Sequence, residues 1–96
     1  MNYSIKNDNT LLLFCINKNV EQQNYKGYFM YSADCGQYIS TEITGNNDSS
    51  VMEKMFYQAI RDIKSVYGEE IKELASVCLK KFYDSKLQKF NQEHIK

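Results

Sequence analysis

Proline and tryptophan are absent from this sequence of 96 residues, and glycine, cysteine and histidine are scarce. Because proline lacks the backbone N–H donor, its absence means that no helix or strand carries a proline break. The four glycines stand far apart, which excludes the glycine-rich loop that cradles phosphate groups. The apolar run from Leu11 to Ile16 is six residues long, far short of a membrane span. We therefore expect neither a phosphate-loop enzyme nor a membrane protein.

The three cysteines and the single histidine do not form a recognisable reactive or metal-binding pattern. Cys15, Cys35 and Cys78 are odd in number and lack the spacing of a disulfide framework or a structural zinc site. A cysteine nucleophile needs a nearby base, and the only histidine is His94, two residues before Lys96. We expect reduced thiols, no metal, no cofactor and no catalytic residue. Since residues 1–6 also lack the apolar core of a secretory signal, we expect a cytoplasmic protein.

Positive and negative charges balance, because Lys+Arg and Asp+Glu both number 12. Proteins that bind nucleic acid usually carry a basic excess, since phosphate neutralisation supplies most of their affinity. The C-terminal segment nevertheless has a local basic bias with aromatic residues between the lysines. Its candidate nucleic-acid contacts are Lys80, Lys81, Lys86 and Lys89. Nucleic-acid binding is therefore kept as the alternative from another functional class.

The segment from Gly45 to Glu53 divides the chain into two unlike halves. Before it, apolar residues come in short runs rich in tyrosine, isoleucine and phenylalanine, which is typical of strands. The expected strands are 10–16, 25–33 and 37–44, with a short edge strand at 3–6. Short connections between them favour an antiparallel meander. The segment itself contains Ser50-x-x-Glu53, the spacing of a capping box that opens a helix.

After this segment, apolar residues recur every three or four positions, the spacing of amphipathic helices. The first helix is expected over 51–67, with Gly68 as its C-terminal stop. A second helix opens at Glu69 and buries a stripe that includes Ile71 and Phe82. Residues 84–85 could cap a separate short helix, and a late strand at 75–79 is the less favoured alternative. The predicted fold is one α+β domain over 1–96. A three- to four-stranded antiparallel sheet (1–44) packs on two or three helices (49–92).

Alternation within the strands predicts which side chains face away from the helices. Lys26 marks one face of its strand as solvent-directed, and Tyr28 and Met30 share that face. In the next strand, inward Ile39, Thr41 and Ile43 would leave Tyr38, Ser40 and Glu42 outside. The first long strand is apolar on both faces, so its outer side would extend the patch. The alternative is that the last helix wraps around and covers this face.

A neutral domain without catalytic motifs and with an outer apolar patch is best interpreted as a protein-binding protein. The expected contact residues are Tyr28, Met30, Tyr38 and Glu42. The expected functional class is an inhibitor or immunity-type protein that neutralises a toxin or enzyme by steric occlusion. The alternative is a phage-encoded antagonist of a host defence system. A homodimer that buries the same patch against itself is a further possibility.

Overall fold

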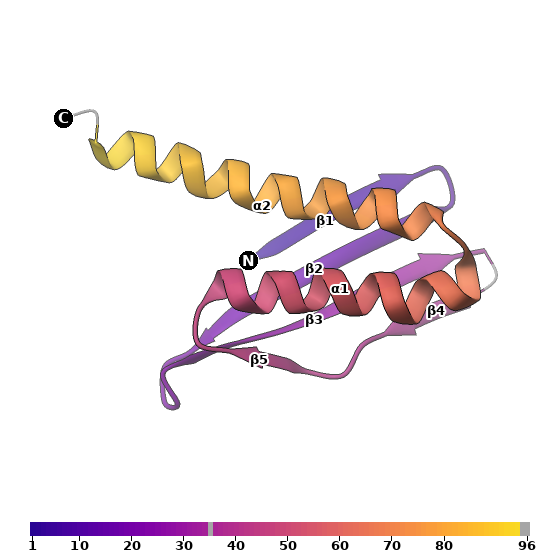
Figure 1. Ribbon diagram of the computed structural model, residues 1–96, viewed down its shortest axis with the longest axis horizontal. Helices are drawn as coiled ribbons and strands as arrows, with labels where there is room; N and C mark the ends of the chain where they lie inside the picture. The colour runs from indigo at the N-terminus through magenta and orange to yellow at the C-terminus, as the bar shows by residue number, and fades with distance from the viewer. Residues whose placement is uncertain (35, 95–96) are drawn as a thin grey trace.

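The computed structural model describes residues 1–34 and 36–94, with side chains for all of these except 65–67 and 89–94. Five strands precede two helices along the chain (Figure 1). The strands are β1 (Asn2–Asn7), β2 (Thr10–Asn19), β3 (Asn24–Ala33), β4 (Gly36–Ile39) and β5 (Ile43–Gly45). The helices are α1 (Asp48–Tyr67) and α2 (Glu70–His94). This arrangement confirms the predicted α+β fold.

All strand pairs in the sheet are antiparallel, in the order β1-β2-β3-β4, and β5 also pairs with β3. Strand β2 pairs with β1 through Tyr3↔Phe14 and with β3 through Phe14↔Phe29. The edge strand expected at residues 3–6 is therefore present, as β1. The single strand expected over 37–44 is instead two short strands, β4 and β5, which share one edge of β3.

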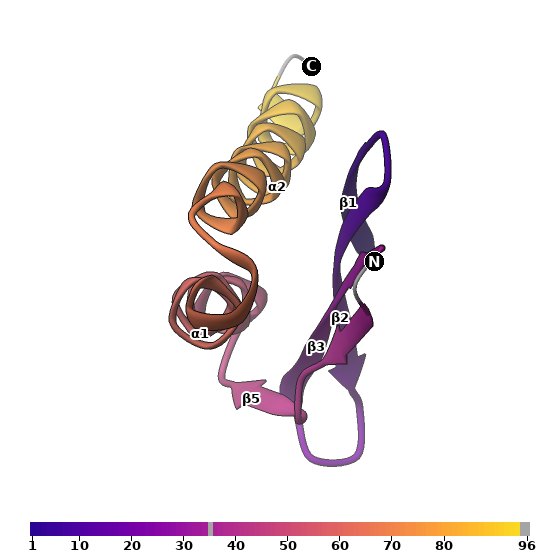
Figure 2. The same ribbon diagram turned by 90° about the vertical axis from the view of Figure 1, so that its right-hand side faces the viewer.

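Both helices lie on the same face of the sheet, as the end-on view shows (Figure 2). The core between the two layers is made of alternate strand residues and of one stripe from each helix. From the sheet it contains Leu12, Phe14, Ile16, Phe29, Tyr31 and Ile43, and from α1 Val51, Met52, Met55, Ala59 and Ile63. From α2 it contains Ile71, Leu74, Ala75, Cys78 and Phe82, which is the predicted stripe.

Helix α1 begins three residues before the predicted start. Asn47 is the N-cap residue, and its side-chain Oδ1 accepts the N–H of Ser50 at 2.8 Å. The expected capping box of Ser50 and Glu53 is therefore wrong, because Asn47 already satisfies the free N–H at this position. The helix ends as predicted at Gly68, whose φ of 96° is readily adopted only by glycine.

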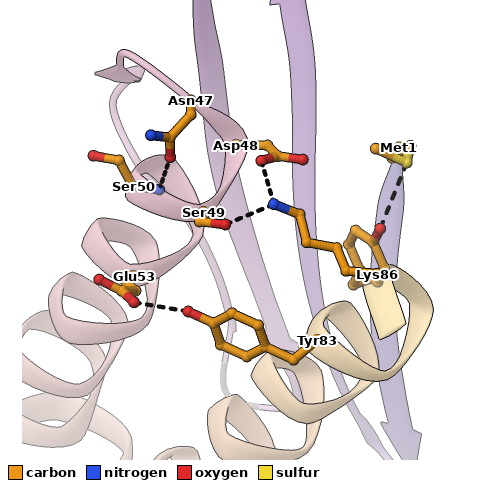
Figure 3. Close-up of polar contacts among 9 residues, drawn as sticks. Met1, Asn47, Asp48, Ser49, Ser50, Glu53, Tyr83 and Lys86 are labelled. Atoms are coloured by element: carbon orange, nitrogen blue, oxygen red, sulfur yellow. Dashed lines mark hydrogen bonds and ion pairs between the residues drawn. The ribbon is translucent and has the colours of Figure 1, made fainter. Parts of the chain in front are cut away.

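Helix α2 runs without a break from Glu70 to His94, so both the separate short helix at 84–85 and the strand at 75–79 are wrong. Contacts with the start of α1 hold this part of α2 in place (Figure 3). Lys86 Nζ lies 2.6 Å from Asp48 Oδ1 and 2.6 Å from Ser49 Oγ. One turn away, the Tyr83 hydroxyl donates to Glu53 Oε1 at 2.7 Å. The start of α1 is thereby tied to α2 near its middle.

A one-residue bulge separates β4 from β5. Met30 pairs with Ile39 and Gly27 pairs with Ile43, so two residues of β3 face three residues, 40–42, on the other strand. The buried Ser40 fills this irregular site, because its Oγ accepts the Phe29 N–H at 2.9 Å. An extra residue shifts the alternation of side chains by one position. The faces of β4 are therefore exchanged relative to an uninterrupted strand.

Candidate protein-binding surface

The face of the sheet that points away from the helices is called the open face here. Its central side chains alternate with the core residues of β2 and β3, and Ile39 joins them as the pair of Met30. The open face has an apolar centre consisting of Leu11, Leu13, Cys15, Tyr28, Met30 and Ile39. Within the described part of the chain no segment covers it, and α2 packs beside α1 on the other face (Figure 2). For these residues, the alternative in which the last helix wraps around the sheet is therefore wrong.

Exposure differs across the open face. Ile39 is 60% exposed and Tyr28 is 42% exposed, whereas Leu11, Leu13 and Met30 are half-buried among their neighbours. An isolated exposed apolar residue is common on protein surfaces, but neighbouring ones on three adjacent strands form a patch. Exposed apolar patches are typical of contact surfaces.

Three of the four predicted contact residues lie on the open face or at its margin. Tyr28 and Met30 occupy its centre, and the side-chain amide of Gln37 lies 2.9 Å from the sulfur of Met30. Glu42 is exposed at the margin, where its Oε1 lies 3.5 Å from Lys26 Nζ. Because Glu42 is 62% exposed in its side chain, this ion pair contributes little to stability and is available for exchange with a partner.

Tyr38 was predicted to face outward, and this prediction is wrong. Its ring stacks on the buried Phe29 at a centroid distance of 5.7 Å, and its hydroxyl donates to Asp62 Oδ2 of α1 at 3.3 Å. Burial, followed by the charge of Asp62, raises the pKa of Tyr38 above its ordinary value. The bulge at residues 40–42 turns Tyr38 inward and places Ile39 outward. Ile39 was therefore missed, since no residue pattern in 37–44 marks where the extra residue lies.

Cys15 and Tyr28 lie opposite each other at the centre of the open face. The Cys15 thiol is almost fully buried, and its sulfur lies 2.9 Å from Asn2 Oδ1. A hydrogen bond with Cys15, followed by the charge of that thiol, raises the pKa of Tyr28. A tyrosine hydroxyl is protonated at neutral pH whether or not its pKa is raised, so Tyr28 has a hydrogen-bond donor on the open face.

A pocket of about 400 Å³ adjoins the open face at the turn between β2 and β3. Its lining includes Tyr28, the Lys26–Glu42 pair, Asn17 and the exposed Val20. The lining combines an aromatic ring and an aliphatic side chain with amide and charged groups. Such a depression suits one anchoring side chain of a protein partner.

The three proposed nucleic-acid-binding lysines with described side chains do not point in one direction. Lys81 Nζ donates to the Ser4 carbonyl at 2.8 Å, and Lys86 pairs with Asp48 while lying over the ring of Phe82. With 3.6 residues per turn, Lys80, Lys81 and Lys86 point in directions roughly 100° or more apart around α2. The Lys89 side chain lies outside the described residues. Of these lysines, Lys86 has its charge paired with a carboxylate, whereas Lys81 is held by a neutral carbonyl and keeps its charge.

Cys78 is buried in the core, where burial raises the pKa of its thiol from 9.0 to about 11. At neutral pH this thiol is protonated and therefore a poor nucleophile. Among the described residues, no three side chains of His, Cys, Asp or Glu are grouped to hold a metal ion. Cys35 and the side chain of His94 lie outside the described residues.

In the portion of the chain that the structure covers, neither helix has the length and apolar character needed to cross a membrane. Comparison of the chain with protein-family models, with curated proteins and with solved structures gave no match. The surface chemistry described above is therefore the basis for a functional proposal.

Proposed function

We propose that this protein binds another protein through its open face and blocks that partner's working surface, without catalysis of its own. The observation that supports the proposal is an apolar patch on three adjacent strands, left uncovered because both helices pack on the other face. Burying this patch removes apolar area from water, which is the main favourable term in protein association. The tyrosine and methionine at its centre are residue types enriched in such interfaces.

The chemistry of the open face suits a partner with an apolar protrusion. Tyr28 offers a hydroxyl donor beside an apolar ring, and the pocket next to it accepts one side chain. The Lys26–Glu42 pair at the margin offers one charge of each sign. It would therefore favour one orientation of the partner and add little net attraction. Neutralisation of a toxin or enzyme by steric occlusion, in the cytoplasm, is the form of this function that we propose.

Substitution of Tyr28 by glutamate tests the proposal. A carboxylate at the centre of the open face should weaken partner binding at least about thirtyfold, since a central aromatic contact is worth about 2 kcal/mol or more. Tyr57→Glu is the matched control, because Tyr57 is 69% exposed on α1, whose buried side faces the sheet. Both variants should keep the far-ultraviolet circular dichroism of the unchanged protein.

The measurement is quantitative affinity capture from the native cell extract, with and without nuclease, followed by titration of the captured protein. We expect one stoichiometric, nuclease-resistant partner that the Tyr57→Glu variant retains and the Tyr28→Glu variant loses. Full affinity in the Tyr28→Glu variant would show that the open face is the wrong surface. Recovery that disappears with nuclease would instead support the nucleic-acid alternative. A dimer in light scattering that Tyr28→Glu converts to a monomer would mean that the patch binds a second copy.

A further inference from the structure

The two edges of the sheet differ in how they are protected from additional strands. The edge formed by β4 and β5 consists of strands of four and three residues with a bulge between them. Short strands and bulges are common devices that prevent the pairing of an extra strand. The opposite edge is β1, a regular strand of six residues paired on one side with β2. Edge pairing is therefore most feasible at β1.

The hydrogen bonds between β1 and β2 show which backbone groups of β1 point outward. The Met1 nitrogen donates to Ile16 O at 2.7 Å and the Ile16 N–H donates to Met1 O at 2.9 Å, so this pair exchanges both bonds. In an antiparallel ladder, bonded and non-bonded pairs alternate. Every second residue of β1 therefore directs its N–H and C=O away from β2. These residues are Asn2, Ser4 and Lys6.

Lys81 of α2 occupies one of these outward groups. Its Nζ donates to the Ser4 carbonyl at 2.8 Å, while the neighbouring Phe82 packs edge-to-face on Tyr3 at a centroid distance of 5.4 Å. Helix α2 thus covers the inner side of β1 and also reaches its free edge. Figure 1 shows α2 running along β1 and continuing beyond the sheet. A lysine at an edge discourages strand pairing and must move before a strand can bind.

Helix α2 lies over the β1 side of the sheet. Helix α1 packs on β2, β3 and β5, and α2 packs on β1 and less on β2. Among the described residues, no strand pairs with the far side of β1. A strand added there would pair with β1 beside α2.

We propose that the β1 edge binds one extended segment of a partner protein as an added strand, with Lys81 exchanging the Ser4 carbonyl for a carboxylate on that segment. The segment's backbone would pair with Asn2, Ser4 and Lys6. Its inward side chains would be apolar, because they continue the row of Tyr3 and Ile5, which pack on the core. The side chains of the segment that face away from the helices would be polar, as at Ser4 and Lys6, which are both exposed.

A second copy of this chain is the alternative occupant of the β1 edge. Antiparallel pairing of β1 with β1 of a second copy would place two α2 helices on the same face of the joined sheet. A single extended segment brings no helix of its own. The carboxylate follows from charge: an incoming N–H takes the Ser4 carbonyl from the exposed Lys81 ammonium, and a carboxylate on the segment would pair with the released positive charge better than a neutral group.

This proposal is independent of the open face, since it rests on β1 and α2. The test uses a display library of ten-residue peptides with alternating apolar and randomised positions, selected on the complete chain. Selected peptides should be enriched in Asp or Glu at one randomised position. Ser4→Pro removes an outward N–H but no bond to β2, and proline is tolerated at such edge positions. It should weaken peptide binding about tenfold, as measured by fluorescence anisotropy.

Three further arms complete the experiment. Lys81→Met should abolish the preference for the acidic peptide over its amide analogue, whereas Tyr28→Glu should leave peptide binding unchanged. The peptide should lose affinity when it is N-methylated at the alternate residues that face β1, and keep it when the other set is methylated. This arm does not depend on the folding of any variant. Failure to select a binding peptide, equal tolerance of both methylation patterns, or self-association through β1 would each overturn the proposal.

Discussion

Ser40 should be essential to the stability of the bulge, although it lies outside the strands. It is 8% exposed, and its N–H donates to the Phe29 carbonyl at 2.9 Å while its Oγ accepts the Phe29 N–H at 2.9 Å. The same hydroxyl donates to the Thr41 carbonyl at 3.0 Å. A side-chain oxygen therefore takes the place of a strand carbonyl where the ladder is interrupted. Ser40→Ala removes this acceptor and leaves a buried backbone donor unpaired.

The expected loss of stability follows from that unpaired donor. A buried N–H without a partner costs about 1–3 kcal/mol, and the lost bond to Thr41 adds less, so we expect about 2 kcal/mol in total. For a domain of this size, that free energy lowers the melting temperature by about 10 °C. The loss of volume is a single oxygen atom, so the effect is not attributable to a cavity.

Urea unfolding followed by circular dichroism measures this change, and amide hydrogen exchange locates it. The Phe29 amide should exchange faster in Ser40→Ala, while the Tyr28 amide, which faces β2, should serve as an unchanged reference. Ser76→Ala is the matched control, because Ser76 is exposed and its hydroxyl bonds only the Lys72 carbonyl of its own helix. A loss below about 0.5 kcal/mol for Ser40→Ala would refute the reasoning, since hydrogen-bond deletions of this kind cost more.

Two further predictions concern the core. Gly27→Ala should destabilise the protein by about 1–3 kcal/mol in urea unfolding, because the added Cβ would lie 2.7 Å from Val51 Cγ1 and 2.9 Å from the Cys15 carbonyl. An unchanged midpoint of urea unfolding would contradict this prediction and show that α1 shifts freely. Burial raises the pKa of the Cys78 thiol in the folded state from 9.0 to about 11. The buried protonated thiol therefore contributes fully to the free energy of unfolding below pH 9, and this contribution is lost as the pH rises from 9 towards 11. Unfolding midpoints measured over this range should fall less steeply in Cys78→Ala than in the unchanged protein, and equal slopes would contradict a buried thiol.

The regular parts of this fold are predictable from residue spacing. In β3, Lys26 on one side and the aromatic residues on the other are sufficient to predict that Phe29 and Tyr31 are buried and Tyr28 is not. The apolar stripes of the two helices are equally predictable, because burial of one helix face requires apolar residues every three or four positions. In both cases, the need to bury one face applies to every residue of the strand or helix.

The wrong predictions concern positions where the sequence allows two local interactions equally well and the folded chain forms only one of them. Asn47 and Ser50 are both good N-cap residues, and the choice depends on where β5 ends and how the chain enters α1. The bulge is harder to predict, since Ile39 and Tyr38 are both suitable inward residues. The hydrogen bond of Tyr38 to Asp62 and its contact with Phe29 settle the alternation, and these partners are 24 residues ahead and 9 residues behind in sequence.

The bulge changes which residues form the candidate site without removing the site. With uninterrupted alternation, Tyr38 would lie outside and Ile39 inside; the inserted residue exchanges a tyrosine for an isoleucine on the open face. Both are apolar enough to keep the patch continuous with Met30, the pair of Ile39. The exchange also gives α1 a polar contact with β4 through Asp62. The same inserted residue interrupts the β4–β5 edge, which is why the proposed protein binding uses the open face and the proposed strand addition uses β1.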